Sequence, residues 1–138
     1  MISGLSHLTF IVRDLDRSEA MLANVLGARR VYDSGAATFS HFRERFFLVG
    51  DIWIAIMEGE SLSLPTYNHV AFKIEERDYD HCLDALRYLG LRILDDRPRV
   101  PGEARSIYFY DDDNHLFELH TGTLEERLAR YGQRKQTD

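Results

Sequence analysis

An internal repeat restricts the possible folds of this chain more than any other feature of its sequence. The segment SHLTFIV at 6–12 resembles NHVAFKI at 68–74, an offset of 62 residues. After one inserted residue the similarity continues, since LGAR at 26–29 matches LGLR at 89–92. Two modules of this kind can share one hydrophobic core and place a site between them. The repeat therefore predicts a duplicated fold with equivalent positions in its two halves.

Length and composition limit the class of protein. The 138 residues, 44% of them hydrophobic and 12% aromatic, are enough for one domain with a buried core. No apolar stretch approaches the ~18 residues of a membrane span, and Met1 is not followed by a secretory signal segment. The single cysteine, Cys82, excludes an internal disulfide and is typical of a cytoplasmic protein. The net charge of −6 argues against nucleic acid or a membrane surface as the partner.

Hydrophobic periodicity and helix-capping residues predict the order βαβββ in each half, an α+β fold. In the first half we expect strands at 5–12, 30–32, 45–49 and 52–57, with a helix at 14–26. In the second half we expect strands at 69–74, 92–94, 106–110 and 116–120, with a helix at 78–89. A capping box at 123–126 opens a C-terminal helix of about 123–133. The interpretation is a single domain over 1–138, with module one at about 4–58 and module two at about 67–121.

Histidine and carboxylate side chains on the predicted strands indicate a metal site. His7 and His69 occupy the same place on the first strand of each module, and Glu118 lies on the last strand of module two. The equivalent of Glu118 in module one is Ala55, so three ligands would leave open coordination positions for a substrate. Two histidines and one carboxylate with open positions suit Mn, Fe, Zn or a similar divalent ion. The alternative is two histidines at strand ends and a solvated glutamate.

At these residues the chain resembles the vicinal oxygen chelate superfamily, which includes glyoxalase I, extradiol dioxygenases and fosfomycin resistance proteins. Within it the chain is similar to the manganese-dependent fosfomycin epoxide hydrolases of the FosX type. The similarity extends from MISGLSH through ERFFLVGDIW and YNHVAFKI to RSIYFYDDDNHLFELHTGTLEERL. The resemblance implies a cupped mixed sheet, Mn²⁺ as cofactor, and His7, His69 and Glu118 as ligands. It also implies a homodimer with paired modules, in which one site takes His7 from one chain and the other two ligands from its partner.

Glu44 distinguishes a hydrolase from a transferase within this resemblance. Taken alone, Glu44 is a surface charge between Arg43 and Arg45 at the start of a strand. The resemblance assigns it as the general base that takes a proton from the attacking water, because water is a poor nucleophile at neutral pH. The metal would bind the phosphonate and act as a Lewis acid on the epoxide oxygen. Thr9 matches a threonine close to that oxygen, although it could be an ordinary strand residue.

Two further residues correspond to substrate contacts in the resemblance, and the repeat adds a third candidate. Tyr108 and Arg127 match positions that hold the phosphonate, which an arginine can bind through two hydrogen bonds. Tyr108 could equally pack in the core, and Arg127 could be a solvated charge on a helix. Trp53 stands at the position equivalent to Leu116 and is a candidate for a pocket wall, with a core role as the alternative.

A loop at 99–105 is expected to close over the phosphonate together with Ser106. Within this loop Ala104 stands where FosX-type proteins usually have glycine, so closure of the loop and affinity could differ. His120 shares the predicted strand face of Glu118 and is either a neighbour of the metal site or a hydrogen-bonded core residue.

Two other functions remain open on the sequence alone. The first is a fosfomycin transferase that uses glutathione or another thiol, an enzyme that would not need Glu44. The second is a metal-free antibiotic-binding module of the bleomycin-resistance kind, which has no use for His7, His69 and Glu118 together.

Overall fold

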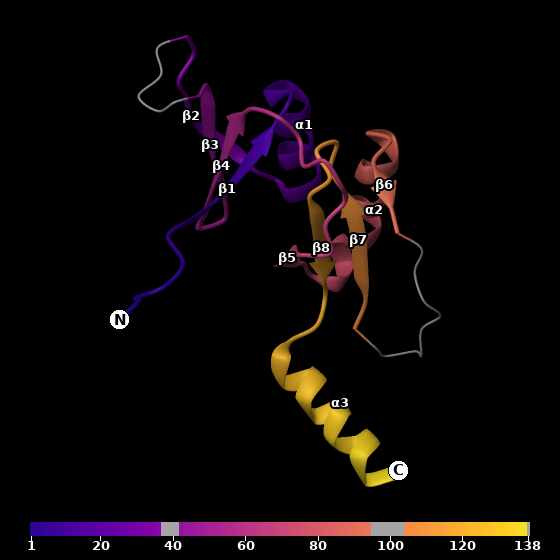
Figure 1. Ribbon diagram of the computed structural model, residues 1–138. Helices are drawn as coiled ribbons and strands as arrows, with labels where there is room; N and C mark the ends of the chain where they lie inside the picture. Colours follow the sequence, from indigo (N-terminus) through magenta and orange to yellow (C-terminus); the bar gives the residue numbers. More distant parts are fainter. Residues whose placement is uncertain (37–41, 95–103, 138) are drawn as a thin grey trace.

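The computed structural model describes residues 1–36, 42–94 and 104–137 (Figure 1). The first half consists of β1 (His7–Val12), α1 (Leu15–Leu26), β2 (Arg29–Asp33), β3 (Glu44–Val49) and β4 (Ile52–Glu58). The second half consists of β5 (His69–Lys73), the short 3₁₀ helix η1 (Glu76–Asp78), α2 (Tyr79–Tyr88), β6 (Arg92–Ile93), β7 (Ser106–Tyr110) and β8 (Leu116–His120). The helix α3 (Leu124–Thr137) follows. The βαβββ order predicted for each half is confirmed.

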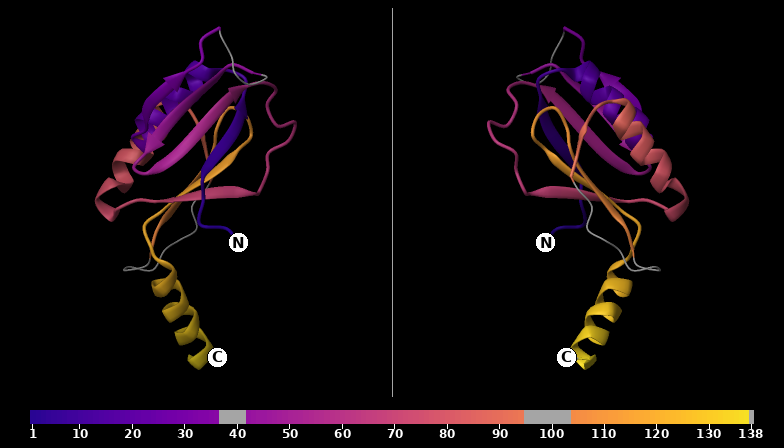
Figure 2. Two further views of the ribbon diagram at one scale, coloured as in Figure 1. Left: turned by 90° about the vertical axis from the view of Figure 1, so that its left-hand side faces the viewer. Right: turned by 90° about the vertical axis from the view of Figure 1, so that its right-hand side faces the viewer.

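Each half forms a four-stranded mixed sheet with the same topology. The order is β1-β4-β3-β2 in the first sheet and β5-β8-β7-β6 in the second. β1 runs parallel to β4 and β5 runs parallel to β8, whereas the other neighbours are antiparallel. β1 and β5 are therefore edge strands, each with one side open to a further strand. Figure 2 shows the two sheets from both sides.

The two halves share one hydrophobic core. Helices α1 and α2 contact each other, and their side chains Leu22 and Leu86 belong to the same buried cluster as Ile54 of β4 and Phe117 of β8. We call the sheet faces that carry Ile54 and Phe117 the inner faces, and the opposite faces the outer faces. Because both inner faces border the same core, the outer faces are directed away from each other.

The ends of α1 follow from the local sequence. The side chain of Asp14 accepts hydrogen bonds from the N–H groups of Asp16 and Arg17, which have no partner inside the helix. Gly27 ends the helix in the left-handed conformation, with φ 67°. Glycine adopts this conformation without the steric cost that a side chain adds, so the chain turns directly into β2.

The acidic turn between β7 and β8 connects the two halves. The buried carboxylate of Asp113 accepts the N–H of Arg13 at 2.9 Å and the hydroxyl of Ser61. Asn114 has a left-handed φ of 68°, and its side chain donates to the carbonyl of Leu62 at 2.7 Å. The acidic run at 111–114 is therefore a turn, and it anchors the linker between the sheets.

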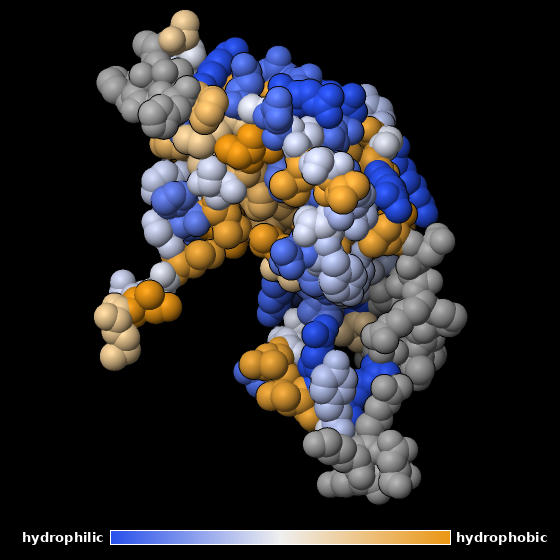
Figure 3. Space-filling view, viewed as in Figure 1, coloured by the Kyte–Doolittle hydropathy of each residue, from blue (hydrophilic) through white to orange (hydrophobic). Residues whose placement is uncertain are grey.

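Helix α3 leads away from both sheets (Figures 1 and 2). It starts as the capping box predicted, since the Thr123 hydroxyl accepts the N–H of Glu126 at 3.2 Å. Its side chains Leu124, Leu128 and Tyr131 are exposed. Apolar atoms also appear on α3 and on the hollowed face between α3 and the N-terminal segment (Figure 3). No helix in the described ranges is long and apolar enough to cross a membrane.

Candidate active site

Four of the predicted site residues lie on the outer face of the first sheet. His7 and Thr9 alternate with core residues along β1 and therefore share a face. The strand register pairs His7 with Trp53 on β4. Glu44 on β3 is paired with Met57, which lies on the same face of β4 as Trp53. The register therefore brings a histidine, a threonine, a tryptophan and a carboxylate to one surface.

Aromatic contacts hold His7 in place on this surface. The ring centroids of His7 and Trp53 are 4.2 Å apart, and Phe46 packs edge-on against Trp53 at 5.1 Å. His7 Nδ1 lies 2.9 Å from the hydroxyl of Ser6, which leaves Nε2 as the nitrogen for a ligand. The buried Trp53 Nε1 has no hydrogen-bond partner in the described chain. Trp53 therefore packs against His7 and carries a hydrogen-bond donor without a partner in the described chain.

Glu44 is buried, with 8% of its surface exposed, although its sequence context is that of a surface charge. Its N–H donates to the hydroxyl of Ser34 at 3.0 Å, and its carbonyl accepts the N–H of Ser34 at 3.0 Å. The next side chain, Arg45, is directed to the opposite face, where its Nε donates to Asp33 at 3.0 Å. None of the described residues forms a hydrogen bond with the Glu44 carboxylate, so this group has free acceptor positions.

The predicted site residues on the strands of the second half lie on the outer face of the second sheet. The register pairs Tyr108 with Glu118 and Ser106 with His120 between β7 and β8. His69 on β5 is paired with Leu116 on β8. Because Leu116 is two residues before Glu118, His69 lies on the same face as Glu118. Glu118 and His120 therefore share one face of β8, as the alternation of the sequence predicted.

His69 and Glu118 form a pair that fits two ligands of one metal ion. His69 Nε2 and Glu118 Oε1 are 3.2 Å apart. His69 Nδ1 lies 2.9 Å from the carbonyl of Tyr67, and because a carbonyl can only accept, Nδ1 carries the hydrogen. Nε2 then faces the Glu118 carboxylate, so both groups could act as donor atoms to one cation. Two donor atoms that are each about 2.1 Å from one ion can be about 3 Å apart, so this pair would fit as two ligands of a metal.

Two neighbours orient the Glu118 carboxylate, of which only 5% is exposed. The Ser106 hydroxyl donates to Glu118 Oε2 at 2.7 Å, and His120 Nδ1 lies 2.7 Å from the same hydroxyl. A hydroxyl has a single hydrogen, so His120 donates to Ser106 while Ser106 donates to Glu118. Such hydrogen bonds fix the direction of a metal ligand.

Tyr108 keeps its phenolic proton near neutral pH and therefore remains a hydrogen-bond donor. Burial raises the pKa of Tyr108 to about 12, and its hydrogen bond to Glu118 together with the Glu118 charge adds to this shift. The positive charge of Arg127 on α3 acts on Tyr108 in the opposite direction. The Tyr108 phenol and the Arg127 guanidinium are therefore close enough to interact electrostatically at the second outer face.

The sequence matches a family of known proteins over most of its length. The model of the Glyoxalase/Bleomycin resistance protein/Dioxygenase superfamily matches residues 4–119. The fosfomycin resistance protein FosX of Mesorhizobium japonicum is 62% identical over 130 residues, which cover 94% of each chain. The chain belongs to the FosX family. A FosX-family member with two four-stranded mixed sheets agrees with the fold class that the sequence predicted.

Solved FosX structures share this fold. The crystal structure of FosX from Listeria monocytogenes with Mn(II) and sulfate is 53% identical, has a TM-score of 0.83, and is matched over 95% of this chain and 99% of its own. A mutant of that FosX, with Mn(II) and 1S,2S-dihydroxypropylphosphonic acid, has a TM-score of 0.84 at 53% identity over the same shares. The metallothiol transferase FosB of Lysinibacillus sphaericus is 36% identical, over 97% of this chain and 93% of its own.

The two outer faces of this FosX-family chain do not meet within one molecule. His69 and Glu118 are in contact, whereas His7 belongs to the other sheet, across the shared core. In the part of the chain that the structure describes, no group of three or more His, Cys, Asp or Glu residues is arranged to hold a metal ion. One chain therefore brings together two of the three predicted ligands.

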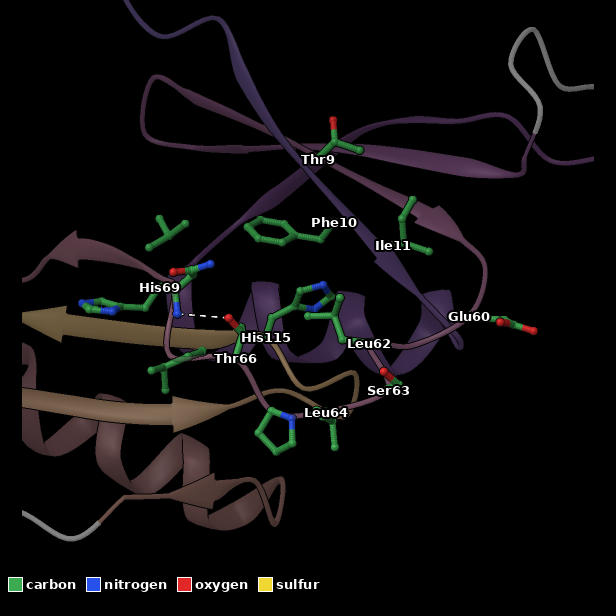
Figure 4. A pocket seen from close by; sticks show the side chains of 14 residues that line it. Thr9, Phe10, Ile11, Glu60, Leu62, Ser63, Leu64, Thr66, His69 and His115 are labelled. Carbon is green, nitrogen blue, oxygen red and sulfur yellow. Dashed lines mark hydrogen bonds between the residues drawn. The ribbon is translucent and has the colours of Figure 1, made fainter.

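A pocket of about 680 Å³ lies between β1, the linker and β5 (Figure 4). Its lining is mainly apolar and includes Phe10, Leu62 and Leu64. Thr9 and His69 border it, but the side chain of Thr9 points away from it (Figure 4). Neither Glu44 nor Glu118 lines this pocket, so it is not the site that the sequence predicted.

Sequence reasoning missed the hydrogen bonds that support the site residues. The bond from Glu44 to Ser34 joins residues on either side of a connection between strands, and only the dipeptide Ser-Gly at 34–35 signalled a turn there. The contact between the Tyr67 carbonyl and His69 involves a main-chain group, so no residue type in the sequence indicates it. Most of the predicted lid, residues 99–103, lies outside the described residues.

Proposed function

We propose that this chain confers fosfomycin resistance by adding water to the epoxide of the drug in a metal-dependent reaction, with Glu44 as general base. The observation that supports this proposal is the Glu44 carboxylate, which is buried on the same outer face as His7 and Thr9 and has no hydrogen-bond partner in the described chain. The diol bound with Mn(II) in a FosX relative is the type of product that water addition to an epoxide forms.

The complete site belongs to a homodimer, in which the first outer face of one chain covers the second outer face of its partner. The placement of His7 and Glu118 on faces directed away from each other supports this arrangement. The free edges of β1 and β5 also support it, since such edges can pair between chains. Each dimer then contains two equivalent sites.

The ligand set is His7 from one chain and His69 with Glu118 from the other, and it holds Mn²⁺ with open positions. When bound, the ion acts as a Lewis acid on the epoxide oxygen and binds the phosphonate. The Tyr67 carbonyl keeps the lone pair of His69 on Nε2, and the Ser106 hydroxyl directs the Glu118 carboxylate. These contacts arrange two ligands before the ion arrives.

The remaining residues act on the substrate. Glu44 takes a proton from water as the water oxygen bonds to an epoxide carbon, and the carbon–oxygen bond of the ring breaks. The released alkoxide oxygen takes a proton from solvent while Glu44 gives its proton back to solvent, and the Thr9 hydroxyl donates a hydrogen bond to that oxygen. Tyr108 and Arg127 hold the phosphonate as donors, with Ser106 beside them. Trp53 closes the wall next to His7.

A thiol transferase is the second candidate, because one FosB relative is 36% identical and is described as a metallothiol transferase. A thiolate is a strong nucleophile without a base, so a buried, unpaired Glu44 has no role in that reaction. A metal-free binding module is disfavoured by the convergence of His69 and Glu118, which leaves a position for a cation.

Phosphorus NMR of fosfomycin with the Mn²⁺-loaded dimer, with and without glutathione, tests the proposal. We expect the diol phosphonate at the same rate in both samples. Conversion only in the presence of thiol would support the transferase instead. Binding of the drug without Mn²⁺ and without conversion would support the binding module.

A further inference from the structure

We infer that Ser34 is a positioning residue for Glu44, an inference that rests on the proposed function. Ser34 follows β2 directly and is 9% exposed. Its N–H donates to the Glu44 carbonyl at 3.0 Å, and its hydroxyl accepts the Glu44 N–H at 3.0 Å. One buried residue therefore binds both main-chain groups of the proposed base, the carbonyl through its N–H and the N–H through its hydroxyl.

Glu44 depends on this contact because it is the first residue of β3. In an antiparallel ladder the main-chain groups of successive residues point to alternate neighbours. On the β4 side the bond runs from the Glu58 N–H to the Arg43 carbonyl at 2.8 Å, so the groups of Glu44 point to the other side, where Ser34 lies. The hydrogen bonds to Ser34 hold the main chain of Glu44 and so help to set the direction in which its side chain leaves the strand.

The Ser34 hydroxyl accepts the hydrogen bond of the Glu44 N–H, which a main-chain carbonyl would accept in a regular antiparallel ladder. Without it, the Glu44 N–H would be buried with an acceptor missing, and the main chain would be free to move. The adjacent pair of Asp33 and Arg45 would remain, with its hydrogen bond of 3.0 Å, so the change would be confined to Glu44. A shift of a catalytic group by about 1 Å can reduce a rate by up to roughly 100-fold.

The first test compares two buried serines in the Mn²⁺-loaded dimer. Ser34→Ala should reduce kcat for fosfomycin hydration roughly 10-fold, with KM and the affinity for Mn²⁺ unchanged. Ser18→Ala is the matched control, because Ser18 is 7% exposed and lies on α1. We expect wild-type kcat for this control. Equal effects of the two substitutions, or a change in Mn²⁺ affinity on Ser34→Ala, would overturn the inference.

A double-mutant cycle separates a positioning role from a general loss of stability. If Ser34 acts through Glu44, adding Ser34→Ala to Glu44→Gln should cause no further fall in kcat. If the two losses multiply, Ser34 does not act through Glu44 and the inference is wrong, while the general base stands. If Glu44→Gln alone retains the wild-type rate, the proposed function itself fails.

Two conservative variants keep the test valid if Ser34→Ala does not fold. Ser34→Thr retains the acceptor oxygen and should keep kcat close to wild type. Ser34→Cys has nearly the same shape but a weak acceptor, so its kcat should fall severalfold. The opposite order of these two rates would overturn the inference.

Discussion

Two inactive variants should restore activity to each other if the metal site is shared between chains. His7→Ala removes the ligand on the first outer face, and Glu118→Ala removes a ligand on the second. Each variant alone should lose Mn²⁺ and activity together, because the proposed site has only three protein ligands. In a dimer of one chain of each variant, one site lacks both side chains and the other site is intact.

The expected recovery follows from random assembly. If equal amounts of the two variants are refolded together, about half of the dimers are mixed, and each mixed dimer has one intact site of two. About one quarter of the wild-type activity should return, measured as diol formed per chain by phosphorus NMR. Bound Mn²⁺, measured after dialysis, should return in the same proportion.

A matched mixture provides the control. His69 and Glu118 lie on the same outer face, so in a mixed dimer of His69→Ala and Glu118→Ala each site lacks one ligand. This mixture should remain inactive. No recovery with His7→Ala and Glu118→Ala, or equal recovery in both mixtures, would refute the shared site.

Two further predictions concern stability. Leu86 is fully buried between the halves, so Leu86→Ala should lower the free energy of unfolding by about 2–5 kcal/mol in urea titrations, and a loss below about 1 kcal/mol would contradict a shared core. The pKa of Asp33 is lowered from 3.8, first by the N–H of Gly35 and then by Arg45. The ionised form is therefore favoured on folding, and its contribution is lost as the pH falls below 3.8. The stability difference between wild type and Asp33→Asn should be constant near neutral pH and shrink in acid, whereas a constant difference down to pH ~2 would argue against this.

Much of the fold could be predicted because its signals are local. The alternation along 6–12 and 68–74 set the two first strands, and the repeat indicated that the halves have the same order of elements. Asp14 and Gly27 fixed the ends of α1 through side-chain and backbone preferences that act within a few residues. Alternation alone also assigned Glu118 and His120 to one face of β8.

The surroundings of the site could not be predicted in the same way. Glu44 lies between two arginines in the sequence, and its burial depends on the packing of β3 between β2 and β4. Its hydrogen bond to Ser34 depends on where the chain returns after the connection between β2 and β3, and no local pattern determines this position. The partition of His7 and Glu118 between opposed faces depends on the shared core, which no local pattern encodes.

The hydration rate of Glu44→Gln tests the central claim most directly. Glutamine keeps the shape of the side chain but cannot accept the proton from water, so the rate of diol formation should fall roughly 100-fold or more. Binding of Mn²⁺ and of fosfomycin, measured by calorimetry on the same dimer, should be unchanged. Diol formation at the wild-type rate would contradict the account, because Glu44 would then not be the base.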